Sequence, residues 1–172
     1  MLFLGGCART LTGLVYPYLI PRRQAVMEIF TIGFAQTAAA HFFGKLQRAG
    51  IRRLVDVRLN NTSQLAGYAK KDDLSYFLRA ICDVDYEHEP LLAPTQEILD
   101  SFKKHKGSWQ DYERQFLSLM AERRIEENLD RGRFESAPSV LLCSERTAEQ
   151  CHRRLILEYL LPKWPEVLPV HL

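Results

Sequence analysis

The sequence predicts an α/β fold: a single compact domain with a mostly parallel sheet of about five strands and helices on both faces. Three observations support this class. From Met27 onward, short β-rich runs alternate with longer helical patterns, which is typical of parallel sheets connected by right-handed crossovers. The chain has 172 residues, the usual length of one domain. Its composition, 47% hydrophobic and 26% charged, is that of an ordinary globular protein.

The expected strands are short runs rich in β-branched, aromatic and apolar residues. They span 28–33, 53–58, 84–88, 139–143 and 167–172. The expected helices have apolar residues at helical spacing. Two of them also open with a capping box, one beginning at Ser108 and the other at Thr147. They span 37–49, 72–81, 95–106, 109 to beyond Arg124, and 147–161. Gly50 is expected to end the first helix and Pro162 the last.

Residues 1–26 are expected to lie outside the domain. The segment holds three arginines and no acid, and Pro17 and Pro21 interrupt it. Its apolar stretches are shorter than the about 20 residues of a membrane span. No basic residue precedes Arg9, so a secretory signal is not expected. We predict a poorly ordered extension or a misassigned start, followed by a single domain at 27–172 that folds normally without it.

Net charge argues against some function classes. The formal net charge is +2, and it would be about −1 without residues 1–26. The chain therefore lacks the global electrostatic footprint of a nucleic-acid-binding protein, although a local basic groove remains an alternative. We expect a cytoplasmic protein that does not associate with a membrane. The oligomeric state is left open.

The cysteines predict neither a disulfide framework nor a metal centre. There are four, Cys7, Cys82, Cys143 and Cys151, without the spacing of a disulfide-rich domain. Cys143, Cys151, His152 and His171 would be the donors of a zinc site, but the chain has no zinc-motif spacing. We therefore expect reduced thiols, no bound metal and no cofactor.

Two groups of polar residues follow the ends of expected strands, where open parallel sheets bind their ligands. In the first group, alternation places Asp56 and Arg58 on the same face of the strand. The arginine would offer a planar fork to a phosphate or carboxylate, or it would pair with an acid, either Asp56 or Glu145. Further candidates for ligand contacts follow in the loop: Asn60, Ser63, Gln64 and Tyr68. Tyr68 would stack on a base or pack in the core.

The second group spans the end of strand 139–143 and the start of the next helix. Cys143 and Glu145 are followed by Cys151, His152 and Arg153. One strand–loop–helix unit thus carries two thiols, a carboxylate, an imidazole and a guanidinium. A helix start attracts anions and lowers the pKa of a thiol. Each residue also has a structural interpretation, with the cysteines as core residues and the histidine as a capping or surface residue.

These residues together resemble the family called domain of unknown function 488 (DUF488). The resemblance covers about residues 28–172 and is carried by 31–33, 54–58, 143–145 and 151–153. It implies a compact α/β fold but no mechanism. The positions that it marks as motif residues are Asp56, Arg58, Cys143, Glu145, Cys151, His152 and Arg153.

The chain departs from that family pattern after Gly33. Familiar members continue with His-Ser, whereas Phe34 and Ala35 stand here. An imidazole and a hydroxyl are therefore missing from the end of the first strand. If the family's chemistry needs that pair, this chain has lost it or acts on another substrate.

The sequence favours an enzyme that acts on a small anionic or nucleotide-like substrate at the carboxyl ends of the strands. Arg58 and Arg153 would bind the anion, Glu145 or His152 would transfer protons, and Cys151 is a lesser candidate for a nucleophile. Asp56 and Cys143 are further candidates for substrate contacts. As pocket residues, His152 and Arg153 are expected to add little to stability. The alternatives are a nucleic-acid-binding or processing accessory and a binding module that has lost catalysis.

Overall fold

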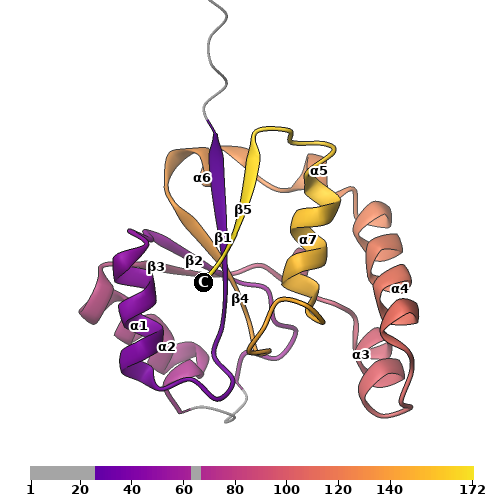
Figure 1. Ribbon diagram of the computed structural model, residues 1–172, viewed down its shortest axis with the longest axis horizontal. Helices are drawn as coiled ribbons and strands as arrows, with labels where there is room; N and C mark the ends of the chain where they lie inside the picture. The colour runs from indigo at the N-terminus through magenta and orange to yellow at the C-terminus, as the bar shows by residue number, and fades with distance from the viewer. Residues whose placement is uncertain (1–25, 63–66) are drawn as a thin grey trace, which may run out of the picture.

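A five-stranded, all-parallel sheet forms the centre of the molecule (Figure 1). The computed structural model describes residues 26–62 and 67–172. The expected extension, apart from Val26, and two candidate ligand contacts, Ser63 and Gln64, lie outside these residues. The strand order is β3-β2-β4-β1-β5. The strands are β1 (Met27–Gly33), β2 (Arg53–Asp56), β3 (Asp85–His88), β4 (Ser139–Cys143) and β5 (Val167–His171). The predicted fold class is confirmed.

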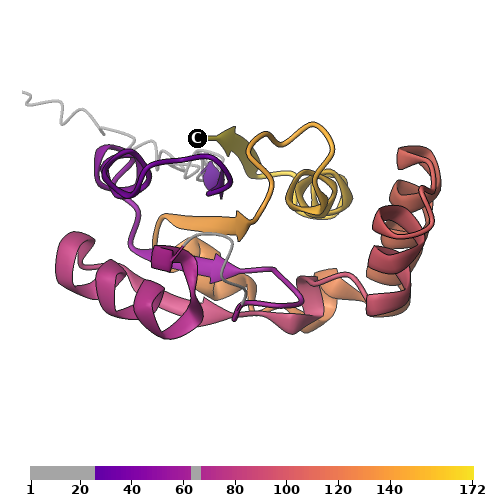
Figure 2. The ribbon, with the colours of Figure 1, turned by 90° about the horizontal axis from the view of Figure 1, so that it is seen from below.

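Helices cover both faces of this sheet. The described residues contain seven α-helices: α1 (Ala39–Arg48), α2 (Lys71–Phe77), α3 (Gln96–Lys103), α4 (Trp109–Glu122), α5 (Ile125–Asn128), α6 (Arg131–Ser136) and α7 (His152–Leu160). Figures 1 and 2 show α1 and α2 on one side of the sheet and α3, α4 and α7 on the other. None of these helices has the length and apolar character needed to cross a bilayer.

Alternation along the strands supplies two hydrophobic cores, one for each face. In β1, Ile29 packs with Phe116 of α4 and Leu155 of α7. Ile32, three residues further along β1, faces the other side of the sheet and belongs to the same core as Phe42 of α1. Strand β4 lies at the centre of the sheet and is buried along its whole length, as expected for a parallel strand covered on both faces.

The connections change face at β4. The chain leaves β1 and β2 through α1 and α2 on one face, whereas it leaves β4 through α7 on the other. Strand β4 pairs with both β1 and β2. Loops that follow neighbouring strands therefore diverge at the carboxyl end of β4, which is where open α/β sheets form a binding crevice. Both polar groups of the sequence lie at this edge.

Several predicted element ends are confirmed. Ser108 is the N-cap of α4, and its hydroxyl accepts a hydrogen bond from the backbone N–H of Asp111 at 3.1 Å. Gly50 follows α1 with φ of 64°, a left-handed conformation that glycine adopts without a steric penalty.

Other predicted ends are wrong. The capping box at Thr147 does not form, since α7 begins at His152 and has no side-chain cap. Residues 144–150 are bends and turns instead, and the loop carbonyls bond to a buried side chain of α7, as described below. Helix α4 stops at Glu122 because Arg124 takes a left-handed conformation with φ of 48°. The ladder of β2 ends at Asp56, before the predicted Arg58.

Candidate functional site

A cavity of about 290 Å³ opens at the carboxyl ends of β2 and β4. Its walls come from the loops after both strands and from α3, α4 and the start of α7. A larger hollow of about 590 Å³ lies at the opposite end of the sheet, beside Met27 and Pro138. We take the smaller cavity as the candidate site, because it contains the thiols and the imidazole and lies at the face change of the sheet.

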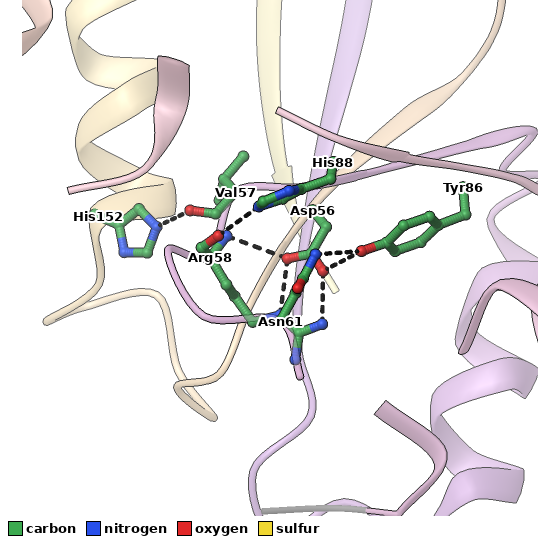
Figure 3. Close-up of polar contacts among 7 residues, drawn as sticks. All are labelled: Asp56, Val57, Arg58, Asn61, Tyr86, His88 and His152. Atoms are coloured by element: carbon green, nitrogen blue, oxygen red, sulfur yellow. Dashed lines mark hydrogen bonds and ion pairs between the residues drawn. The ribbon is translucent and has the colours of Figure 1, made fainter. Parts of the chain in front are cut away.

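Asp56 and Arg58 form a buried ion pair at the edge of this cavity (Figure 3). Two parallel hydrogen bonds join them, from Nε to Oδ1 at 2.8 Å and from Nη2 to Oδ2 at 2.6 Å. The exposed fraction is 0% for Asp56 and 3% for Arg58. The carboxylate also accepts the hydroxyl of Tyr86 at 2.7 Å. Asp56 therefore orients Arg58 and does not line the cavity itself.

One nitrogen of the Arg58 guanidinium is unused. Among the described residues, Nη1 has no hydrogen-bond partner although it is buried, and Arg58 lines the cavity. Burial by itself lowers the pKa of Arg58, but the bonded Asp56 raises it above its usual value, so the group is a permanent cation. The ring of Phe34 lies 5.0 Å from the guanidinium carbon. This aromatic residue, which follows Gly33 at the end of β1, thus packs against the cation.

His152 is held between a backbone carbonyl and a thiol. Its Nε2 lies 2.8 Å from the carbonyl oxygen of Val57, and its Nδ1 lies 3.5 Å from Sγ of Cys143. A carbonyl only accepts, so Nε2 carries the hydrogen and Nδ1 faces the sulfur. The ring also packs edge-on against Phe116. Burial lowers the pKa of His152, but the adjacent Cys143 sulfur and the Val57 carbonyl raise it above its usual value.

The two thiols of the site differ in acidity. A hydrogen bond from Cys151, assisted by His152, holds the pKa of Cys143 well below its usual value against the opposing effect of burial. Burial and the neighbouring Cys143 raise the pKa of Cys151. Cys143 is therefore the more acidic of the two thiols. The sequence had favoured Cys151 as the nucleophile and had assigned Cys143 to substrate contact or to the core.

Arg153 organises the loop between β4 and α7. Its side chain is 2% exposed. Nη1 donates to the carbonyl oxygen of Glu145 at 2.6 Å and to Sγ of Cys151 at 3.3 Å, and Nη2 donates to the carbonyl of Arg146 at 3.3 Å. The residue is not part of the cavity wall. Its contacts favour a structural role over the anion-binding role expected from the sequence.

The burial of His152 and Arg153 argues against the sequence expectation that they add little to stability. His152 is 6% exposed and Arg153 is 2% exposed, and both make buried hydrogen bonds. Removing either would leave buried partners unsatisfied, which costs about 1–3 kcal/mol or more per group. We therefore predict that His152→Ala and Arg153→Ala lower the free energy of unfolding, contrary to the expectation from the sequence.

Close packing of backbone joins this loop to β1. A Cβ on Gly33 would lie 1.7 Å from the carbonyl oxygen of Glu145. The backbone N–H of Ala35 donates to the carbonyl of Ser144 at 2.9 Å. Only glycine allows this approach, so the end of β1 and the loop after β4 meet at Gly33.

Glu145 lies at the rim, and basic residues of α3 lie near it. Its carboxylate is 3.2 Å from Nζ of Lys103, and both side chains are about half exposed, at 47% and 57%. Glu145 does not pair with Arg58, which was one alternative from the sequence. Lys103 and Lys104 line the cavity together with Trp109 and Tyr112. The sequence did not single out these lysines, because nothing local in it marks α3 as a neighbour of β4.

The remaining candidates separate into two sets. Asn60 lines the cavity. Tyr68 donates its hydroxyl to the carbonyl of Thr37 at 2.7 Å and packs among the aromatic rings of α1, so it belongs to the core. His171 bonds to the hydroxyl of Thr31 at 2.7 Å and is not part of the thiol cluster.

Fold and site thus define an α/β protein with a parallel sheet and, where its connections change face, a cavity lined by charged, thiol and aromatic side chains. The family model described as "Domain of unknown function DUF488" matches residues 38–160, which is well over half of the chain. The chain belongs to this family. No curated protein and no solved structure matches it.

Proposed function

We propose that this protein is an enzyme that acts on a small anionic, nucleotide-like substrate bound in the cavity at the carboxyl ends of β2 and β4. The observation that carries the proposal is the orientation of Arg58. Asp56 holds its guanidinium by two hydrogen bonds, and the third nitrogen, Nη1, is buried without a partner among the described residues. An unsatisfied buried donor costs free energy, and an anion in the cavity would satisfy it.

The charge of the cavity wall supports an anionic ligand. Lys103 and Lys104 line the same cavity as Arg58. Each lysine pairs with an acid of the same wall, Lys104 with Asp100 and Lys103 with Glu145, but the lysine side chains remain 67% and 57% exposed and so stay open to an anion. Lysine ammonium groups at the rim attract an anion from solution, and the rigid fork of Arg58 gives direction to its binding.

The aromatic part of the wall supports an organic anion with a flat ring. The rings of Trp109 and Tyr112 stack with centroids 5.1 Å apart and planes inclined by 21°, and both residues line the cavity. Flat aromatic surface beside a basic group suits a nucleobase or a similar ring. The volume of about 290 Å³ lies at the small end for ligand sites and suits a mononucleotide or smaller.

The chemistry would come from the groups around the bound anion. Glu145 stands at the rim with a carboxylate in reach of solvent, and it is the proposed proton-transfer group. Cys143 and His152 line the inner end of the cavity. Both nitrogens of His152 are already bonded, so this ring supports Cys143 and is a poor partner for direct proton exchange with a substrate.

The nucleic-acid alternative has less support. Its stacking residue, Tyr68, packs in the core. The basic groups of the site, Arg58, Lys103 and Lys104, line a cavity, whereas a polynucleotide would need a basic stripe along the surface.

The first test is identification of the natural ligand. The full chain is purified, denatured and analysed by mass spectrometry for released small molecules. Binding is then measured calorimetrically with the retained compound and, in every case, with inorganic phosphate and a nucleoside monophosphate as probes. Incubation with the same compounds, followed by mass spectrometry for products, tests turnover.

Matched variants assign the binding. Arg58→Lys keeps a cation beside Asp56 but removes the free Nη1, and we expect binding at least about tenfold weaker. A Lys103→Gln/Lys104→Gln double variant is also expected to bind more weakly, whereas a control with Lys70 and Lys71 changed to Gln should bind as the wild type does. Binding unaffected by Arg58→Lys would refute the proposed anion site. Binding without any turnover would identify a binding module that has lost catalysis.

A further inference from the structure

Three donor atoms of the kinds that bind zinc converge at the inner end of the cavity. Sγ of Cys143, Sγ of Cys151 and Nδ1 of His152 all lie within 4.8 Å of one another. The three side chains are 4%, 1% and 6% exposed. They come from the end of β4 and the start of α7, and so the fold brings together residues whose spacing in the chain is not that of a zinc motif.

The spacing of these donors fits a tetrahedral ion. Zinc lies about 2.3 Å from a thiolate sulfur and about 2.0 Å from an imidazole nitrogen, which places a sulfur and a nitrogen on one ion about 3.5 Å apart. The distance between Sγ of Cys143 and Nδ1 of His152 is 3.5 Å. The other two donor pairs lie within 4.8 Å, so they would need to contract by no more than about 1 Å to close around an ion.

The tautomer of His152 also fits. Because Nε2 donates to the carbonyl of Val57 at 2.8 Å, the lone pair of the neutral ring is on Nδ1, toward the sulfurs. A metal-binding histidine commonly donates its other N–H to a carbonyl in this way. The carbonyl itself is well anchored, since the N–H of Val57 donates to Leu142 of β4 at 3.1 Å.

The surrounding charge accommodates a divalent ion. Two thiolates and one divalent cation are together neutral, so binding adds no net charge to a buried region. Arg153 donates to Sγ of Cys151 at 3.3 Å, a contact that would stabilise a coordinated thiolate. Among the described residues, no carboxylate pairs with Arg153 within 4.0 Å and none belongs to the donor cluster. The two thiolates would therefore be the negative charges that balance the ion.

We propose that Cys143, Cys151 and His152 bind one zinc ion. Two sulfurs and one imidazole nitrogen favour zinc over the oxygen-preferring divalent ions. Three protein ligands are the number found in catalytic zinc sites, which leave a fourth position open. All three residues line the cavity, so that position would face the ligand. This consequence rests on the proposed function: the ion would polarise an anionic substrate held by Arg58.

The test starts with metal analysis of the full chain, purified without a chelator and also reconstituted with excess zinc after chelation. We expect about one zinc per chain. Replacement of zinc by cobalt should give the visible ligand-field bands of a tetrahedral ion and a sulfur-to-cobalt charge-transfer band. This spectrum is recorded on the wild-type protein, so it does not depend on the folding of any variant.

Two cysteine variants then assign the ligands. Cys151→Ser should retain less than about a tenth of the zinc, whereas Cys82→Ser, a control outside the cluster, should retain all of it. Circular dichroism checks that both are folded. Absence of zinc from the wild type after reconstitution, or a cobalt spectrum without the sulfur band, would overturn the inference. If such a metal-free protein still binds an anion through Arg58, the zinc site is refuted and the proposed function stands. If the protein binds zinc but no anion, the zinc site stands and the proposed function is refuted.

Discussion

The buried pair of Asp56 and Arg58 allows a quantitative test of the site architecture. The carboxylate accepts four hydrogen bonds: from N, Nε and Nη2 of Arg58 and from the hydroxyl of Tyr86. Asp56→Asn removes the negative charge and turns an amide N–H₂ toward one of these donors. It leaves a guanidinium that is 3% exposed without a counter-charge.

The expected loss follows from this geometry. Removing one partner of a buried ion pair costs about 3–5 kcal/mol. For a chain of this length, each kcal/mol corresponds to about 2–4 °C in the melting midpoint, so Asp56→Asn should melt roughly 6–20 °C lower. Arg58→Met should cost a similar amount. The double variant should cost less than the sum of the two, by at least about 1 kcal/mol, because neither charge is then left alone.

Urea unfolding followed by circular dichroism measures these losses. Arg79→Met is the matched control, because Arg79 pairs with Asp83 and Asp85 on the surface and is 66% exposed. It should cost less than about 1 kcal/mol. A loss below about 1 kcal/mol for Asp56→Asn, or additive losses in the double variant, would show that the pair does not stabilise the site as described.

Three further predictions test the surroundings. Gly33→Ala should lower the melting midpoint strongly, since its Cβ would meet the carbonyl of Glu145 at 1.7 Å, whereas a Cβ at Gly67 would meet no atom of the described residues within 4 Å, so Gly67→Ala should not. A chain starting at Met27 should melt within about 2 °C of the full chain; a larger fall means that the preceding residues stabilise the domain. Partial burial and nearby arginine charges lower the pKa of His171, so its contribution to stability is present above about pH 6.5 and is lost as the pH falls through the lowered value. His171→Asn should flatten this part of the curve of unfolding free energy against pH, and an unchanged curve would contradict it.

Local patterns were sufficient for the five strands, for α1, α2, α3, α4 and α7, and for the edge of the sheet that carries the site, whereas the short helices α5 and α6 were not predicted. The β-rich runs, the cap at Ser108 and the stop at Gly50 all depend on interactions within a few residues, and each is confirmed. The failure at Thr147 has the opposite cause. There the loop carbonyls bond to the buried Arg153, and this tertiary contact outweighs a local capping preference.

The roles within the site depended on distances that no local pattern contains. Arg58 had two structural alternatives, pairing with Asp56 or with Glu145, and only the packed structure selected the first while leaving the buried Nη1 without a partner among the described residues. Cys143 looked like a core residue until the fold placed His152 against it.

Sequence alone therefore determined the fold class, the family resemblance and the edge of the sheet to inspect. These follow from hydrophobic periodicity and from the rule that parallel strands present their carboxyl ends together. The tertiary structure decided which groups meet. It brought together two thiols and an imidazole, placed the lysines at the C-terminal end of α3 in the cavity wall, and packed Tyr68 in the core. The physical reason is that hydrogen bonding, charge pairing and metal binding act over a few ångströms, between residues that only the folded chain brings together.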